Sequence, residues 1–165
     1  MGVVSPATPR FIYVIALGSN RRGRHGSPRE AIDAALERIG EVRAVSPIIV
    51  TAPIGPSIRR FANAAALIET AESPPTLLAR LKRIERAMGR RAGRRWGARV
   101  IDIDIVLWSG GVWRSRALSI PHAFWAQRGF VLTPLAAIVP DWRDPRSGRT
   151  IRQMSSLVDR RRPST

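Results

Sequence analysis

The chain has 165 residues, of which 44% are hydrophobic, and it carries a formal net charge of +16 and no cysteine. This length suffices for one domain with a hydrophobic core, while the lack of cysteine excludes disulfides and thiolate metal sites. No apolar run is long enough for a membrane helix, and residues 1–10 lack the apolar stretch of a signal peptide. We therefore expect a flexible tail at 1–10, a single cytoplasmic domain at 11–158 and a second flexible tail at 159–165.

The positive charge is carried almost entirely by arginine, since Lys82 is the only lysine among the 28 basic residues. A field of this sign attracts polyanions in general, including RNA, DNA and nucleotide phosphates. The arginines are spread over most of the chain, so a compositional bias explains them as well as a selected binding patch does. Charge alone therefore identifies no partner.

The first predicted elements are a buried strand and an amphipathic helix. Residues 11–17 (FIYVIAL) form a short apolar run rich in aromatic and β-branched side chains, which is typical of a central strand. We expect residues 18–20 (GSN) to end this strand and residues 21–26 (RRGRHG) to form a basic loop. Residues 27–30 (SPRE) then supply an N-cap, a proline at the first helical position and a capping-box glutamate, and Gly40 ends the helix.

Two further strands and a second helix follow. Residues 42–51 (VRAVSPIIVT) have the composition of a strand, and Pro47 within them indicates an edge strand or a bulge. Residues 61–69 (FANAAALIE) favour a helix by alanine propensity, but this run is short and flanked by turn signals, so we predict a strand. Apolar residues at helical spacing after residues 73–75 (SPP) predict a helix that ends at Gly89.

Residues 94–108 (RRWGARVIDIDIVLW) join an arginine-rich loop to an apolar strand that carries two acids. Because side chains alternate along a strand, Asp102 and Asp104 share one face, with their carboxylates about 6.6 Å apart. Their burial requires a positive partner, which is either a structural ion pair with the nearby arginines or a pair of Mg²⁺ ions. Guanidinium groups upstream of the acids match phosphate geometry, and this combination favours phosphoryl-type transfer.

The predicted order of strand, helix, strand, strand, helix and strand is the βαββαβ pattern. It indicates an α+β fold with a ferredoxin-like core, in which helices cover one face of the sheet. Beyond Trp108 we expect extra C-terminal segments that pack on the sheet, among them one short helix or irregular segment at 127–135 and a last short helix at 151–158. No internal repeat or second domain is evident in the sequence.

These segments together resemble the 6-hydroxymethyl-7,8-dihydropterin pyrophosphokinases of folate biosynthesis. The resemblance rests on LGSN at 17–20, T-x-P-x-G at 51–55, NAA at 63–65, RWGxRxxDIDI at 95–105, PH at 121–122, RGFVL at 128–132 and PL at 134–135. It implies transfer of the β,γ-pyrophosphoryl group of ATP to the hydroxymethyl oxygen of the dihydropterin, with release of AMP. It also implies two Mg²⁺ ions, which would orient the phosphates for in-line displacement.

The resemblance assigns roles residue by residue. It makes Arg90, Arg91, Arg99, Asp102 and Asp104 catalytic, and the two aspartates the ligands of the Mg²⁺ ions. The ATP-binding residues would be Glu85, Arg95, Trp96, Arg99, Ile105, Ser119, His122 and Arg128. The pterin-binding residues would be Thr51, Ala52, Ile54, Phe61, Asn63 and Phe130, of which the two phenylalanines would stack on the ring. We expect a monomer whose partners are ATP and the dihydropterin, with no nucleic acid and no membrane.

Several positions depart from the common family pattern. Phe61 stands where tyrosine is common, which removes a hydroxyl but keeps the ring. Residues 89–96 are shorter than the usual spacing, so the choice between Arg91 and Arg94 for one phosphate-binding role stays open. The basic loop at 21–26 matches none of the family motifs.

Other classes of protein remain as alternatives. An RNA-binding module would need exposed aromatic side chains on the central strands, and Asp102 and Asp104 would repel the phosphates unless a metal intervened. A small phosphatase would need no adenine site, so dependence on ATP separates it from a pyrophosphokinase. An inactive relative could serve as an interaction module, although the intact D-x-D pattern argues against it.

Overall fold

The computed structural model describes residues 2, 5–51, 60–89 and 100–161. Its elements are, in chain order, β1 (Phe11–Ser19), α1 (Pro28–Ile39), β2 (Val42–Val45), β3 (Ile49–Thr51), β4 (Phe61–Thr70), α2 (Pro74–Ala87), β5 (Asp102–Trp108), β6 (Trp113–Arg114), β7 (Ser119–Ile120), a 3-10 helix (Trp125–Gln127), α3 (Gly129–Ile138) and α4 (Ile151–Arg160). None of the helices in these described ranges is long and apolar enough to cross a membrane.

The main sheet has five strands in the order β2, β4, β1, β5, with β3 also paired to β4. Every pairing in this sheet is antiparallel. β1 lies in the centre because both of its faces are apolar, with Tyr13 and Ile15 in one core and Val14 in the other. The predicted end of this strand is wrong, because Gly18 and Ser19 remain paired with β4 and extend it.

The predicted strand at 42–51 is interrupted near its proline, and its two halves, β2 and β3, pair with the outer side of β4. Ser46 bridges the interruption. Its backbone N–H donates to Ala65 O at 2.9 Å, and its hydroxyl accepts a hydrogen bond from Ala65 N at 2.8 Å. A side-chain oxygen thereby replaces a backbone acceptor where Pro47 breaks the ladder. The position of β2 and β3 at the outer side of β4 confirms the prediction of an edge strand.

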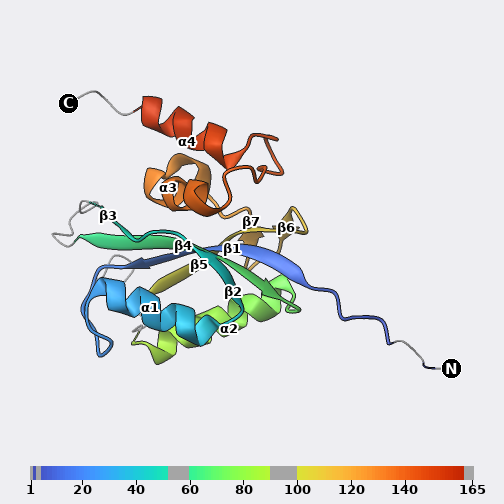
Figure 1. Cartoon of the computed structure of the whole chain (residues 1–165), viewed down its shortest axis with the longest axis horizontal. Helices are drawn as coiled ribbons and strands as arrows, with labels where there is room; N and C mark the ends of the chain where they lie inside the picture. Colours follow the sequence, from blue (N-terminus) through green and yellow to red (C-terminus); the bar gives the residue numbers. More distant parts are fainter. Residues whose placement is uncertain (1, 3–4, 52–59, 90–99, 162–165) are drawn as a thin grey trace.

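Two pairs of helices enclose the sheet. Figure 1 shows α1 and α2 on one face and α3 and α4 on the other. The expectation of helices on one face therefore describes α1 and α2, and the C-terminal segments add a further layer. The core beside α1 and α2 includes Tyr13, Ile15, Leu17, Ile32, Ala62, Ala64, Ala66, Leu77, Leu81, Ile103 and Ile105. The core beside α3 and α4 includes Val14, Ala65, Val106, Leu107, Trp125, Leu132, Leu135, Ile151 and Met154.

The helix starts follow the local sequence. Ser27 Oγ accepts a hydrogen bond from Glu30 N at 3.3 Å, and Glu30 Oε2 accepts one from Ser27 N at 2.6 Å. This is the predicted capping box of α1. Thr150 and Gln153 form the same reciprocal pair at the start of α4. Both helices thus satisfy backbone donors that have no partner within the helix.

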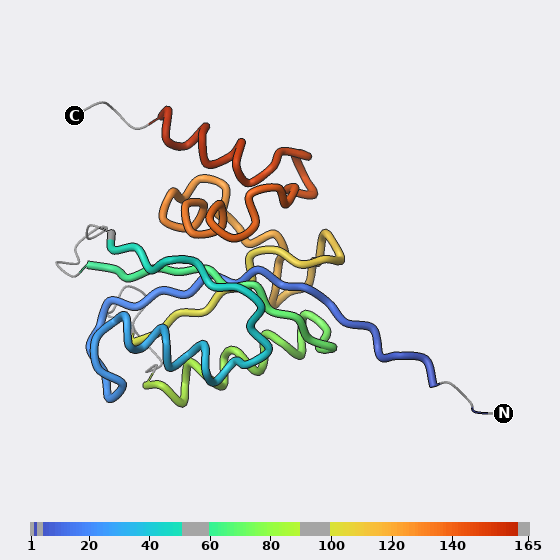
Figure 2. The backbone as a smooth tube through the Cα atoms, in the orientation of Figure 1, coloured from blue at the N-terminus to red at the C-terminus, as the bar shows by residue number. Residues whose placement is uncertain are grey.

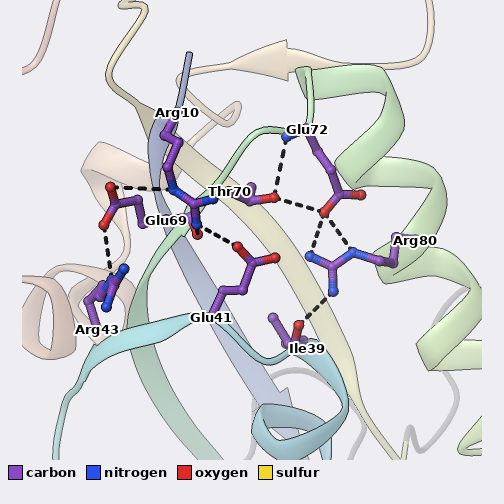
Figure 3. Close-up of polar contacts among 8 residues, drawn as sticks. All are labelled: Arg10, Ile39, Glu41, Arg43, Glu69, Thr70, Glu72 and Arg80. Atoms are coloured by element: carbon purple, nitrogen blue, oxygen red, sulfur yellow. Dashed lines mark hydrogen bonds and ion pairs between the residues drawn. The ribbon is translucent and has the colours of Figure 1, made fainter. Parts of the chain in front are cut away.

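A half-buried network fastens the end of the sheet where β1 begins and β4 ends (Figure 3). Arg80 of α2 donates to Ile39 O, at the end of α1, at 2.6 Å and to Glu72 Oε1 at 2.8 Å. Thr70, the last residue of β4, donates to the same Glu72 oxygen at 3.1 Å. The side chains of Arg80 and Glu72 are each 21% exposed, so solvent screens this pair less than a surface pair. Arg80 therefore ties both helices to β4.

The other ion pairs in Figure 3 are more exposed. Arg10 pairs with Glu41 at 2.6 Å, and Arg43 pairs with Glu69 at 2.9 Å. Surface pairs of this kind contribute little to stability, because water competes for both charges. The Arg80 contacts are therefore the part of the network on which stability depends.

We predict that Arg80→Ala lowers the free energy of unfolding by about 2 kcal/mol, because it removes charge-assisted hydrogen bonds to Ile39 O and Glu72. Urea denaturation followed by circular dichroism measures the difference. Arg83→Ala is the matched control, since Arg83 is exposed on the same helix. It should change stability by less than about 0.5 kcal/mol. Equal losses in the two variants would contradict the role given to Arg80.

Candidate active site

Asp102 and Asp104 lie on one face of β5, as the sequence predicts. The isoleucines at 101, 103 and 105 are buried in the core beside α1 and α2. The two aspartates alternate with them and are half-buried. The carboxylates therefore point to the face of the sheet on which α3 and α4 lie.

The end of β1 separates the two carboxylates from a buried asparagine. Gly18 pairs with Asn63 of β4 on one side and with Asp102 of β5 on the other. Ala16, two positions before Gly18 in β1, pairs with Asp104. Partners across a sheet point to the same face, so the amide and both carboxylates share it. Between them β1 presents a methyl group at Ala16 and only backbone at Gly18, where a Cβ would lie 3.2 Å from Asn63 Oδ1.

The aromatic residues expected to stack on a pterin lie on two elements around this row. Phe61 precedes Asn63 by two positions on β4, so its side chain points to the same face. It is half-buried and pairs with Thr51, the last residue of β3. Phe130 is in the first turn of α3, a helix that packs on β4, and Arg128 Cζ lies 5.8 Å from its ring centroid. The two rings thus belong to elements that are in contact with each other.

A β-bulge anchors His122 beside Asp104. The pairing of β1 with β5 shifts in register and leaves Val106 outside it. Val106 O accepts a hydrogen bond from His122 N at 3.1 Å. The imidazole Nδ1 lies 2.7 Å from Ala123 O, which can only accept, so Nδ1 carries a proton. Nε2, the other ring nitrogen, lies 4.0 Å from Asp104 Oδ1 and faces the carboxylate.

The local environment makes Asp104 hard to ionise. Partial burial and the neighbouring Asp102 carboxylate raise the pKa of Asp104 above its ordinary value, while His122 and Lys82 act in the opposite direction. The Asp104 side chain is still 41% exposed, so it remains accessible to a ligand. A cation bound beside Asp104 would therefore favour the ionised form of this carboxyl.

The carboxylates of Asp102 and Asp104 suit a Mg²⁺ ion whose other ligands include phosphate oxygens. Within the described parts of the chain, no group of three or more acidic, histidine or cysteine side chains could enclose a metal. Mg²⁺ is usually bound through one or two carboxylates, with phosphate oxygens and waters completing its shell. Asp102 and Asp104 supply such carboxylates on one face, so the residues present fit a magnesium-nucleotide complex.

Glu85 of α2 supports the backbone between the two aspartates. Its fully buried carboxylate accepts a hydrogen bond from Ile103 N at 2.8 Å. Lys82 Nζ lies 3.3 Å from both carboxylate oxygens and balances their charge. The expectation that Glu85 also lines the nucleotide stays a prediction.

The sequence analysis missed the support of β5 by Lys82 and Glu85, although a signal for it was present. Glu85 lies on the apolar stripe of α2, between the buried Ile84 and Met88. An acid in such a stripe, three residues after the only lysine of the chain, indicates a buried ion pair.

The structure gives the positions of three further predicted site residues, and the others lie outside the described ranges. Ile105 is buried in the core, so its side chain lies on the face opposite to the aspartates. Ser119 begins β7 and pairs with Arg114 of β6, and Arg128 is exposed immediately before α3. The predicted site residues that lie outside the described ranges are Ala52, Ile54, Arg90, Arg91, Arg95, Trp96 and Arg99.

Comparison with known proteins identifies the family. Residues 14–140 match the family model described as 7,8-dihydro-6-hydroxymethylpterin-pyrophosphokinase (HPPK). The 2-amino-4-hydroxy-6-hydroxymethyldihydropteridine pyrophosphokinase of Pseudomonas aeruginosa is 43% identical over 140 residues, which cover 81% of this chain and 83% of the relative. The protein of the same name from Synechocystis is 39% identical over 147 residues, with 88% of this chain and 75% of the relative covered.

Solved structures share the fold. A crystal structure of a Plasmodium falciparum HPPK-DHPS triple mutant with SDX-DHP matches with a TM-score of 0.73 at 16% identity, over 93% of this chain and 45% of that chain. At this identity the likeness concerns the fold alone. The match to the family model, in contrast, includes β4, β5 and β1 from Val14 onward, and hence the whole row from Asn63 to Asp104. The chain therefore belongs to the 7,8-dihydro-6-hydroxymethylpterin-pyrophosphokinase family.

Proposed function

We propose that this chain transfers the pyrophosphoryl group of ATP to the hydroxymethyl oxygen of 6-hydroxymethyl-7,8-dihydropterin, with release of AMP, in folate biosynthesis. Membership of the family supports the reaction. The observation that carries its assignment to this site is the sheet register, which sets Asn63 and Asp102 on either side of Gly18. The Asn63 amide suits a heterocycle, and the Asp102 carboxylate suits metal-bound phosphates. The two residues are thus held about 10 Å apart, on the outer two of three adjacent hydrogen-bonded strands.

The phosphate side of the proposed site is built on Asp102 and Asp104, which we assign as ligands of two Mg²⁺ ions. When bound, such ions would neutralise the phosphates and align the attacking and leaving oxygens. Two residues of the chain favour the carboxylate form of Asp104 that binds metal. His122 Nε2 lies 4.0 Å from Asp104, and both His122 and Lys82 lower the pKa of that carboxyl.

The pterin side of the proposed site is built on Asn63, Phe61 and Phe130. The Asn63 amide offers both a donor and an acceptor, which a planar heterocycle can use edge-on. It is 7% exposed, so hydrogen bonds made there are shielded from competing water. The two phenylalanines offer apolar ring faces for stacking. We orient the hydroxymethyl group toward β5, because transfer requires its oxygen to reach the phosphates.

In addition to the predicted role of Glu85 at the nucleotide, we propose that Glu85 and Lys82 act through β5. The Glu85 carboxylate holds Ile103 N–H, which lies in the chain between the two aspartates. A fixed backbone at this point keeps both carboxylates in one orientation before a ligand arrives. Such preorganisation avoids the free-energy cost of ordering the site during the reaction.

We also propose the ferredoxin-like description for the core. The antiparallel strand order β2, β4, β1, β5 supports it, as do the positions of α1 and α2 in the chain and on one face of the sheet (Figure 1). A cytoplasmic monomer that binds ATP and the dihydropterin, without nucleic acid or membrane, is our proposal for the working form.

Phosphorus NMR of the purified protein with ATP, Mg²⁺ and 6-hydroxymethyl-7,8-dihydropterin tests the reaction. Formation of AMP together with a pterin diphosphate is the expected result. Formation of ADP would indicate a different phosphoryl transfer, and inorganic phosphate released without pterin would favour a phosphatase. A folded protein without turnover would favour a binding module.

We predict that Asp104→Asn has opposite effects on activity and on stability. Turnover should fall by roughly a hundredfold or more, because the amide lacks the charge that a Mg²⁺ ligand provides. The metal-free variant should nevertheless be more stable than the wild type at neutral pH. The raised pKa of Asp104 means that its ionised form costs free energy in the folded state, and asparagine removes this cost.

The pH dependence follows from the direction of this shift. Because the pKa of Asp104 is higher in the folded than in the unfolded chain, its contribution to stability becomes less favourable as the pH rises from about 4 through the folded value. The difference in stability between the variant and the wild type should therefore increase over this pH range and disappear below it. Thermal denaturation in EDTA measures it, with Asp33→Asn, at an exposed aspartate of α1, as control. An Asp104→Asn variant less stable than the wild type at pH 7 would contradict the prediction.

We predict that Glu85→Ala and Glu85→Gln differ in activity. Alanine leaves the buried Ile103 N–H without its acceptor, so kcat/KM for MgATP should fall roughly tenfold. Glutamine keeps an oxygen at this place, and Lys82 is 34% exposed and can turn to water, so the loss should stay within about threefold. Steady-state kinetics measure both. Equal losses would show that the charge of Glu85 matters and its hydrogen bond does not.

A further inference from the structure

The basic segment between β1 and α1 contains a closed hairpin at residues 23–26. The N–H of Gly23 donates to Gly26 O and the N–H of Gly26 donates to Gly23 O, both at 3.1 Å. Gly26 has φ 96°, a conformation that favours glycine. The place of a Cβ on Gly26 is filled by the carboxylate of Glu30, which is held by the backbone N–H of Ser27. We call residues 23–26 the glycine hairpin.

The glycine hairpin packs directly on Val100. A Cβ on Gly23 would lie 2.9 Å and 3.2 Å from the two methyl carbons of Val100, which is closer than ordinary packing allows. Val100 is buried and β-branched, so its side chain cannot turn away at low cost. This contact therefore leaves room only for glycine at position 23.

The glycine hairpin also contacts the end of α2. Arg24 Nη2 donates a hydrogen bond to Ala87 O at 3.0 Å. Ala87 is the last residue of α2, where carbonyl groups lack partners within the helix and a cation is favourable. Figure 2 shows the segment that leads into α1 running beside this last turn of α2. One short hairpin thus holds both the end of α2 and the approach to β5.

These contacts bear on the active site because the glycine hairpin continues from β1. Gly18 pairs with Asp102 at the start of β5, and a few residues later Gly23 touches Val100. β1 and the segment after it therefore hold β5 at two successive points. A shift of Val100 would move Asp102, whereas Asn63 on the opposite side of β1 would stay in place.

We propose that the glycine hairpin is a positioning element for the phosphate side of the site, with Gly23 and Arg24 as its positioning residues. By packing on Val100 and capping α2, it fixes the start of β5 and the direction in which the Asp102 carboxylate points. The inference rests on the proposed function, since the ligand of Asp102 is taken to be magnesium-bound ATP. Damage to the hairpin should then weaken the use of ATP and spare pterin binding.

The test is a double-mutant cycle of Gly23→Ala and Val100→Ala. Gly23→Ala should lower kcat/KM for MgATP roughly tenfold, because small displacements of catalytic groups have large effects, and should leave the Kd of the dihydropterin within about twofold. Val100→Ala removes the methyl groups that the new Cβ would meet. The double variant should therefore return to within about threefold of the Val100→Ala variant.

Two matched controls accompany the cycle. Gly2→Ala is the control for Gly23→Ala and should have no effect, because a Cβ on Gly2 meets nothing within 4 Å.

The second control belongs to a separate test variant, Arg24→Ala. This variant should reduce kcat/KM for MgATP by roughly threefold, since it removes the hydrogen bond to Ala87 O. Arg29→Ala removes the same charge from an exposed position of α1 and should leave the kinetics unchanged.

Amide hydrogen exchange at residues 101–104 measures the same coupling without turnover. Gly23→Ala should speed exchange there, and the double variant should restore the slow rate. If the wild type forms no AMP, the proposed function fails, and the exchange experiment still decides on the hairpin. Unchanged exchange in Gly23→Ala, a loss of pterin affinity equal to the loss for ATP, or no recovery in the double variant would overturn the proposal.

Discussion

The structure depends on holding two like charges side by side on one strand. Asp102 and Asp104 share a face of β5, and partial burial together with their mutual repulsion raises the pKa of Asp104. The fold tolerates this because the opposite face of β5 is packed into the core and because Glu85 holds its backbone from α2. Two carboxylates presented on one face of a strand are ligands that make this surface suitable for metal-bound phosphates.

The central strand serves stability and binding in different parts of its length. Its first half carries Tyr13, Val14 and Ile15, which are fully buried and fill the two cores. In its second half, the residues on the face of the aspartates are small, namely Ala16 and Gly18. Large side chains there would separate the groups that the register brings together. The change from large to small residues along β1 thus divides the sheet into a supporting end and a binding end.

Local sequence signals predicted most elements but not their alignment. The alternation of isoleucine and aspartate, the capping box at 27–30 and the proline at 47 each act within a few residues, so they can be read without the fold. Strand register depends on pairing between distant segments, so the placement of Asn63 and Asp102 on either side of Gly18 could not be deduced.

Two features of the site needed the tertiary structure. Glycine and serine usually end strands, yet Gly18 and Ser19 stay in β1 because β4 pairs with them. The support of β5 by Glu85 likewise requires knowledge of which backbone α2 faces. The expected roles of residues 52–54 and 90–99 concern parts of the chain outside the described ranges, and they stay predictions.

The interruption near Pro47 also bears on how the protein behaves when concentrated. A continuous edge strand exposes backbone groups that can pair with another molecule, and apolar side chains such as Val45 and Val50, which are 43% and 58% exposed, would favour such pairing. Here the edge is divided into runs of four and three residues, and the proline between them lacks a backbone donor. The same residue that shapes the sheet beside β4 thereby protects the protein against edge-to-edge aggregation.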